Sequence, residues 1–299
     1  MKHPILYLSS LCLTLAFTSA CTTGTSSKSS PRSYVVQHSG STNSVVSKLG
    51  RSHWIQVRKT SKRAEKKLYA ALGASEFSAA ITESRNYLGK HPKNIHGMTV
   101  LASALAMSGQ FQLAEYYANL MEKFHGSSPT TKNIKGLAIL RRPGLKIEDF
   151  RRSIAYFRAA VDMNSKEIAG GLNLGHLYLK MGQASKARAI FKQTSLRCDG
   201  CTVAEMGRGT ALVRMRKFMS AKRVFDEIIS DHPNYLEAHY RLALVEINRK
   251  NKDVDSAKAH LSKILDSPKN ERLDLKRKAN VLLRRIDAKE HGFERETYE

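Results

Sequence analysis

The chain has 299 residues, and its 50 Lys and Arg against 26 Asp and Glu give a formal net charge of +24 and a pI near 10.0. Such a charge favours acidic partners, whether nucleic acid, anionic lipid or an acidic protein surface. The sequence has no His-Glu-x-x-His, no Gly-x-Ser-x-Gly and no Gly-x4-Gly-Lys-Ser/Thr phosphate loop. We therefore expect no catalytic residues, no metal site and no cofactor.

The first residues have the pattern of an export signal. A basic Lys2 precedes an apolar run over 5–17, and the small residues of 18–20 stand before Cys21. An apolar run of this length is too short for a membrane core of ~30 Å, so residues 1–20 are predicted to be a signal peptide.

Small residues followed by Cys21 resemble a bacterial lipobox, although Thr18 stands where Leu is commoner. The resemblance implies that Cys21 becomes the lipidated first residue of the mature protein, anchored by more than one acyl chain. Thr22 is not the Asp that is typical of inner-membrane retention. The expected location is therefore the periplasmic face of the outer membrane, which argues against nucleic acid as the partner.

Two segments link this anchor to the rest of the chain. Residues 21–52 are rich in Ser, Thr and Gly, and they are predicted to be a flexible tether with a reach of roughly 30 Å. Residues 51–67 are densely basic and include Trp54, with Glu65 as the sole acid. Two interpretations stay open for this segment: contact with anionic headgroups, with the indole at the interface, or a solvated first helix.

A repeat then becomes visible, and it is clearest over residues 168–234. Three residue types recur 34 residues apart, namely Gly175 and Gly209, Ala187 and Ala221, and Phe191 and Phe225. This is the tetratricopeptide (TPR) period, in which a helix hairpin repeats at fixed length. The resemblance to the TPR family extends over about 230 residues and implies an all-α fold, a helix-hairpin solenoid.

The array extends in both directions from this stretch. Ala80 and Ala114 hold the second-helix position earlier in the chain, and about five extra residues with Pro143 and Gly144 are expected in a loop between paired helices. We predict about six TPR repeats over 53–270 and a capping helix and tail over 271–299. Apolar residues are expected on one face of this cap, namely Leu273, Leu275, Ala279, Leu282 and Ile286.

One Cys-x-x-Cys pair, Cys198 and Cys201, falls at the turn between the two clearest repeats. A zinc site would need a second pair of ligands, and none is at hand. A disulfide that clips the turn, free thiols and a redox centre all stay open.

The resemblance also implies a partner-binding groove lined by the first helix of each repeat. Its predicted residues are Asn133, Leu137, Arg141, Leu172, His176, Lys180, Met206, Thr210, Arg214, Tyr240 and Leu244. Arg141, Lys180 and Arg214 hold equivalent places in successive repeats, so they would form a basic ladder suited to an acidic peptide or helix.

Signal peptide, lipobox, tether and repeats together resemble the TPR lipoproteins of tad (Flp) pilus assembly and the type IV pilus pilotins. This resemblance implies a non-enzymatic scaffold that assists assembly of a pilus or secretin complex. An adaptor for peptidoglycan-processing enzymes or for outer-membrane barrel assembly is the alternative.

Overall fold

The computed structural model describes residues 44–49, 53–58, 60–164, 168–268 and 272–296. These residues belong to one compact unit, Arg32–Glu299. The predicted signal peptide, Cys21 and the tether as far as residue 43 lie outside the described residues. Within the described part of the chain, no helix is both long enough and apolar enough to cross a membrane.

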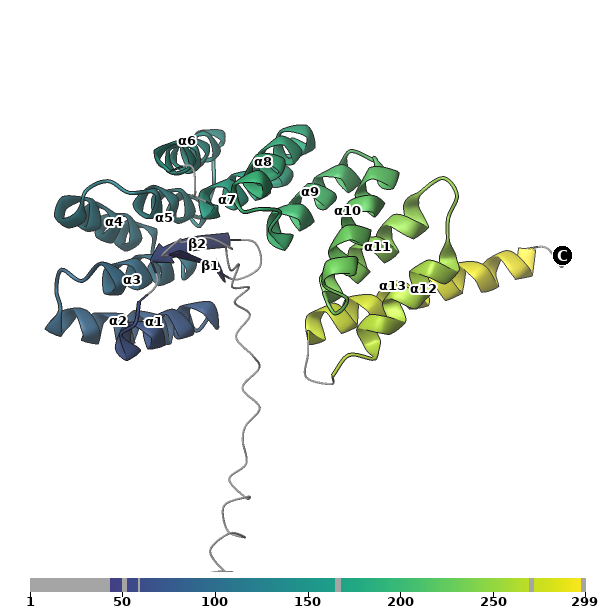
Figure 1. Cartoon of the computed structure of the whole chain (residues 1–299), viewed down its shortest axis with the longest axis horizontal. Coiled ribbons are helices and arrows are strands. Elements are labelled where there is room, and N and C mark those ends of the chain that lie inside the picture. Colours follow the sequence, from purple (N-terminus) through teal and green to yellow (C-terminus); the bar gives the residue numbers. More distant parts are fainter. Residues whose placement is uncertain (1–43, 50–52, 59, 165–167, 269–271, 297–299) are drawn as a thin grey trace, which may run out of the picture. The chain divides into compact units, whose positions relative to one another are not determined.

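Helices follow one another in antiparallel pairs (Figure 1). The pairs are α1 (Arg63–Gly73) with α2 (Phe77–Lys90), α3 (Ile95–Met107) with α4 (Phe111–His125), α5 (Pro129–Leu140) with α6 (Ile147–Met163), α7 (Ala169–Lys180) with α8 (Ala184–Arg197), α9 (Thr202–Arg214) with α10 (Phe218–Asp231), and α11 (Leu236–Asn248) with α12 (Val254–Leu265). A last helix, α13 (Leu273–Glu296), packs on α12 and α11. The predicted helix-hairpin solenoid is thus confirmed, and the first helix of each pair is called its A helix below.

The repeated Gly and Phe residues explain why the paired helices pack closely. A Cβ at Gly175 would lie 2.6 Å from Cζ of Phe191, and a Cβ at Gly209 would lie 2.5 Å from Cε1 of Phe225. Both rings are fully buried. Glycine on the A helix therefore leaves the space that the phenylalanine of the second helix fills, and the 34-residue spacing keeps the two in register.

The turn inside each regular pair also repeats. A residue with positive φ ends the A helix, and it is Ser75, Gly109, Gly182 and Arg216 in the four regular turns. The backbone N–H of Gly109 donates to Ala106 O, and that of Gln110 donates to Leu105 O, which closes the helix end. The left-handed conformation suits glycine best, yet the turn geometry holds Ser75 and Arg216 in it as well.

Part of the insertion of the third pair lies in the loop where the sequence places it. The loop between α5 and α6 runs from 141 to 146, whereas the loop between α3 and α4 runs only from 108 to 110. The rest lengthens α6, which has 17 residues against 15 in α4. The insertion thus leaves the packing faces undisturbed.

The capping helix buries one apolar face. Leu275, Ala279 and Ile286 are buried against the last pair, and Leu282 is partly buried. Leu273 differs from the prediction, since it is 52% exposed. It is the first residue of α13.

A β-hairpin precedes the helices and corrects the prediction for this region. Ser44–Leu49 (β1) pairs antiparallel with His53–Arg58 (β2), with Lys48 opposite Trp54. Residues 44–49, near the end of the predicted tether, therefore form a strand. The basic segment does not begin with a helix, and Trp54 is buried at 3% exposure, so its indole is not at an interface with lipid.

The short link from β2 to α1 is tied down by a buried carboxylate. Glu65, 2% exposed, accepts hydrogen bonds from the hydroxyl of Thr60, the hydroxyl of Tyr87 (2.9 Å) and Nδ2 of Asn94 (2.9 Å), and His96 lies 3.6 Å away. Burial alone would raise the pKa of Glu65, but these hydrogen bonds and the nearby His96 hold it below its usual value. The first helix is therefore fixed by a polar network and is not merely solvated.

Cys198 and Cys201 are bonded to each other, with an S–S distance of 2.02 Å and a Cα–Cα distance of 5.4 Å. Cys198 follows the last residue of α8, and Cys201 precedes the first residue of α9. The bond therefore closes the turn between two successive repeats.

Candidate functional site

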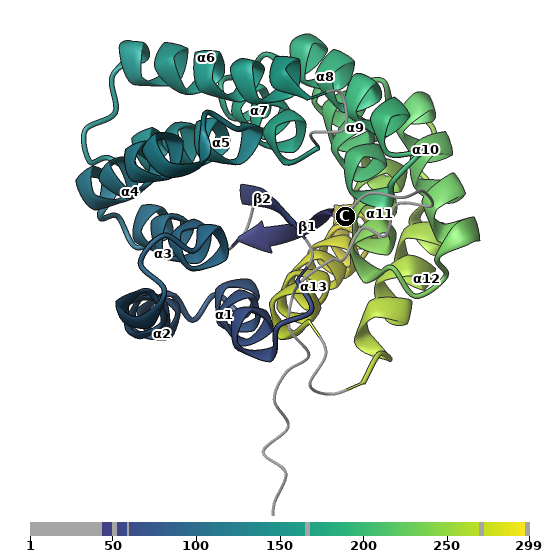
Figure 2. The same ribbon diagram turned by 60° about the vertical axis from the view of Figure 1, so that its left-hand side comes forward.

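The hairpin lies against the A helices, on the side away from α4, α6 and α8 (Figure 2). Its second strand, β2, contacts α3, α5 and α7. We call this surface the hairpin site: the faces of α3, α5 and α7 that contact β2, with the hydrogen-bonding residues Thr130, Asn133, Ile168 and Asn173. Trp54, Ile55 and Gln56 are all buried in it.

Two asparagines hold the main chain of Trp54. Oδ1 of Asn173 accepts from the N–H of Trp54 at 2.8 Å, and Nδ2 of Asn173 donates to its carbonyl oxygen, also at 2.8 Å. Nδ2 of Asn133 donates to the same oxygen at 2.8 Å, and Asn173 Nδ2 donates to Asn133 Oδ1 at 2.7 Å. Both asparagine side chains thus have their amide groups hydrogen-bonded. Together they bind the main chain of an extended strand.

Gln56 adds one contact by its backbone and one by its side chain. Its carbonyl oxygen accepts from the Thr130 hydroxyl at 3.0 Å, and its Oε1 accepts from the N–H of Ile168 at 2.7 Å. Ile168 directly precedes α7, where backbone N–H groups have no partner within the helix. A side-chain amide at this place in the strand therefore caps α7.

His53 begins β2 and is partly buried. Burial, followed by the positive charges of Arg141 and Lys180, lowers the pKa of its imidazole to about 4. At neutral pH the hairpin therefore places an uncharged ring beside two cations.

This shift predicts that acid releases the hairpin. A released His53 binds its proton near pH 6.5, and the docked one only near pH 4, so docking is strongest above pH 6.5 and weakens as the pH falls to 4. A shift of this size corresponds to roughly 3 kcal/mol. Trp54 is the single tryptophan of the chain, so its emission should move to longer wavelength over this range. His53→Gln should remove that transition, and the same pH profile in both proteins would contradict the assignment.

The predicted groove residues are distributed over successive A helices. Asn133 and Leu137 lie on α5 with Arg141 directly after it, Leu172, His176 and Lys180 on α7, Met206, Thr210 and Arg214 on α9, and Tyr240 and Leu244 on α11. The structure brings Asn133 to the hairpin site, and it brings Arg141 and Lys180 close to His53.

Several of these residues are buried or packed against other parts of the chain. Leu137, Leu172 and Met206 are buried core residues, and the ring of His176 packs edge-on against Phe191 with centroids 5.2 Å apart. Tyr240 packs against the core under α13. Leu137 and Leu172 belong to the same core as Trp54 and Ile55 of the hairpin.

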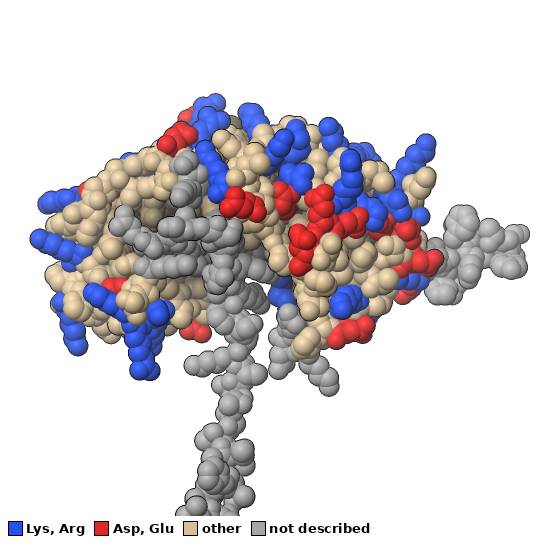
Figure 3. All heavy atoms as spheres, viewed as in Figure 1, with Lys and Arg blue, Asp and Glu red and all other residues tan. Residues whose placement is uncertain are grey.

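The ladder residues Arg141, Lys180 and Arg214 are all exposed, at the C-terminal ends of α5, α7 and α9. Arg141 donates to Met107 O at 2.8 Å, and the ammonium of Lys180 lies 5.7 Å from the centre of the Phe150 ring. On the face drawn in Figure 3, Lys and Arg are spread widely, and Asp and Glu are denser over the C-terminal helices.

The sequence predicted no binding role for three residues of the hairpin site, Thr130, Ile168 and Asn173, nor for Gln56 of the strand that they hold. A signal for Asn173 does exist, because an amide stands between Leu172 and Leu174 on a helix that is otherwise apolar. A buried amide needs a partner, so this position should have been expected to bind something.

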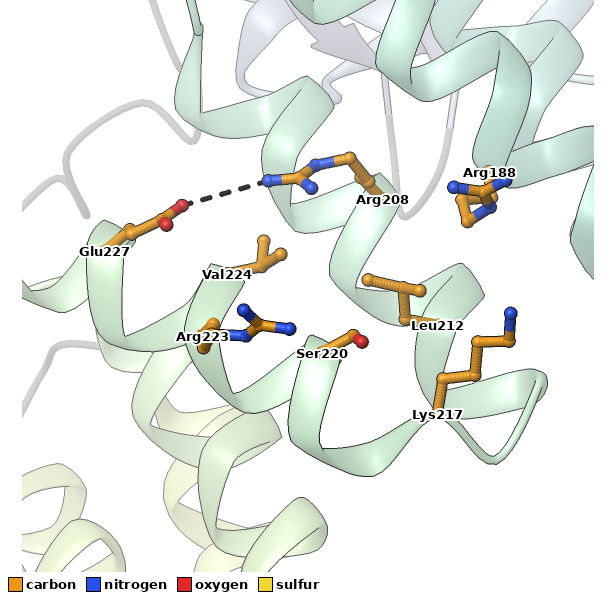
Figure 4. A pocket seen from close by; sticks show the side chains of 8 residues that line it. All are labelled: Arg188, Arg208, Leu212, Lys217, Ser220, Arg223, Val224 and Glu227. Carbon is orange, nitrogen blue, oxygen red and sulfur yellow. Dashed lines mark ion pairs between the residues drawn. The ribbon is translucent and has the colours of Figure 1, made fainter.

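A second concavity lies between α8, α9 and α10, with a volume of ≈ 350 Å³ (Figure 4). Four cations line it, namely Arg188, Arg208, Lys217 and Arg223. Arg208 is already engaged by Glu205 at 2.5 Å and lies 3.8 Å from Glu227. No predicted site residue lines this pocket.

Among the described residues, no group of three or more His, Cys, Asp or Glu is arranged to hold a metal ion.

Comparison with known proteins gives the same repeat. Models described as tetratricopeptide repeats match residues 172–193 and 206–270. No curated protein matches the chain.

Three solved structures share the fold at low sequence identity. A thermophilic TPR protein of Thermus thermophilus superposes with a TM-score of 0.52 at 18% identity, covering 61% of this chain and 95% of that one. A chain of the APC/C hetero-tetramer Cut9-Hcn1 gives 0.57 at 15% identity, covering 75% and 42%. A TPR protein from Parabacteroides merdae gives 0.51 at 14% identity, covering 74% and 87%. The chain therefore contains tetratricopeptide repeats and has the fold of TPR proteins, a fold that serves protein–protein interaction.

Proposed function

We propose that the chain is a non-enzymatic scaffold lipoprotein of the periplasmic face of the outer membrane, which assists assembly of a tad (Flp) or type IV pilus secretin complex. Cys21 is its lipidated residue, and residues 22–43 are the tether that carries the repeats away from the lipid surface. An adaptor for peptidoglycan-processing enzymes or for barrel assembly is the rival role.

One observation supports the scaffold role more than any other: the A helices hold an extended strand by its main chain. The amides of Asn133 and Asn173 are built for a polypeptide, since they pair with both the N–H and the carbonyl of one residue.

The location rests on the sequence of the first residues. A short apolar run, small residues and Cys21 are typical of exported lipoproteins, and a bonded Cys198 and Cys201 suits an oxidising compartment. The pilus assignment rests on the resemblance of this whole plan to pilus-assembly lipoproteins.

Capture from detergent extracts of the cell envelope tests the proposal. The tagged full chain should retain secretin or pilus components, and Lys180→Glu with Arg214→Glu should reduce their recovery severalfold, because an acidic partner would then meet like charge. The matched control is Lys123→Glu with Lys192→Glu, which reverses two exposed charges on the second helices α4 and α8.

Two results would count against the proposal. Retention of hydrolases or barrel-assembly subunits in place of pilus components would favour the rival role. Equal recovery by the Lys180/Arg214 and Lys123/Lys192 variants, both folded by circular dichroism, would remove the A-helix surface as the binding face.

A further inference from the structure

The hairpin occupies the surface that a TPR scaffold would offer to a partner. Its anchor residues Trp54 and Ile55 are at most 3% exposed, and the five hydrogen bonds described above between β2 and the helices all involve α5, α7 or the residue before α7. The hairpin therefore behaves as a ligand that is part of the same chain.

Most of this binding does not depend on which residue stands at each position. Asn173 pairs with the N–H and the carbonyl of Trp54, and Asn133 and Thr130 each donate to a main-chain carbonyl. A strand from another protein presents the same groups at the same spacing. The hairpin site thus accepts an extended strand in general, with a large side chain at the place of Trp54 and an amide at the place of Gln56.

One position of the hairpin is poorly matched to the surface. The positive charges of Arg141 and Lys180 act on His53 and lower the pKa of its imidazole, and the neutral ring gains nothing from them. A carboxylate at this place would instead be attracted by both charges, and such an attraction at a partly exposed site strengthens binding modestly.

We propose that the hairpin site is a binding site for an extended strand of a partner protein that carries Asp or Glu where β2 carries His53, and that β2 fills the site until such a strand replaces it. This inference rests on the proposed scaffold function, because it names the chemistry of the strand that the scaffold takes. The hairpin leaves as a unit, since β1 pairs with the opposite edge of β2.

Synthetic peptides test this inference on the full chain. The two probes are the sequence of residues 52–58 and the same sequence with His53→Asp. The chain carries Trp54→Ala and Ile55→Ala, which removes the anchors of its own hairpin and its only tryptophan. The Trp of each peptide is then the sole tryptophan signal, and its emission should move to shorter wavelength on binding.

The Asp peptide should bind about five- to tenfold more tightly than the His peptide at neutral pH and low salt. Arg141→Ala with Lys180→Ala, added to the same chain, should abolish this preference and leave the affinity for the His peptide nearly unchanged. Asn133→Ala with Asn173→Ala should weaken both peptides equally, because it removes contacts to the main chain.

Equal affinity of the two peptides for the chain with Arg141 and Lys180 intact would overturn the inference. Absence of binding by either peptide, while hydrogen exchange shows that the β2 amides are released and circular dichroism shows folded helices, would overturn it as well. Neither result touches the scaffold function, which stands or falls with the capture of envelope components.

Discussion

Phe191→Ala should lower the free energy of unfolding by about 3–5 kcal/mol, the usual cost of emptying a fully buried phenylalanine site. The ring is fully buried between two glycines of successive A helices: a Cβ at Gly175 would lie 2.6 Å from its Cζ, and one at Gly207 would lie 2.4 Å from its Cδ1. The cavity would be bounded by helix backbone, which cannot move in to fill it. Urea unfolding followed by circular dichroism measures the loss.

Phe124→Ala is the matched control for this change. Phe124 lies at the end of α4 and is 39% exposed, so its truncation removes the same atoms from a position that is largely solvated. We expect a loss below about 1 kcal/mol there. Similar losses at Phe124 and Phe191 would contradict the packing described for the repeats.

Asn173→Ala should release the hairpin while the helices stay folded. The change leaves the N–H of Trp54 without its acceptor and removes one of two donors to its carbonyl, and each buried group that is left unpaired costs about 1–3 kcal/mol. Trp54 should then emit at longer wavelength at neutral pH, and hydrogen exchange at Ile55 should accelerate by at least about tenfold, the factor that corresponds to 1.4 kcal/mol.

Asn119→Ala provides the control for the asparagine change. Asn119 is exposed on α4, so its removal should alter neither the emission of Trp54 nor the exchange of the strand. An unchanged emission in Asn173→Ala would show that the asparagine pair does not hold β2.

The repeats were predictable because each one carries its own packing partner. Gly175 and Phe191 meet within one helix pair, as do Gly209 and Phe225, so local spacing alone reveals the fold. The insertion after α5 was predictable for a related reason, since Pro143 and Gly144 suit only a loop.

The hairpin was not predictable in this way. Trp54 and Asn173, which are hydrogen-bonded, are 119 residues apart in the sequence. A contact of this kind leaves no repeating pattern in the sequence near either residue. The alternation of Trp54, Gln56 and their neighbours was masked by a high density of basic residues, which is typical of a solvated segment. The strand on the A helices was missed for the same reason: a surface that the chain itself fills cannot be recognised from one helix at a time.

The contact of one strand with three A helices also bears on how the array unfolds. In a repeat array each unit ordinarily contacts only its neighbours, so units are lost one by one from an end. Here β2 contacts α3, α5 and α7, and one core extends from Trp54 to Ala211 of α9. Two separate cores follow it, one shared by α9, α10 and α11 and one by α11, α12 and α13. The N-terminal repeats should therefore melt cooperatively as one block and the C-terminal repeats should fray stepwise. Release of the hairpin would therefore make the N-terminal repeats unfold stepwise as well.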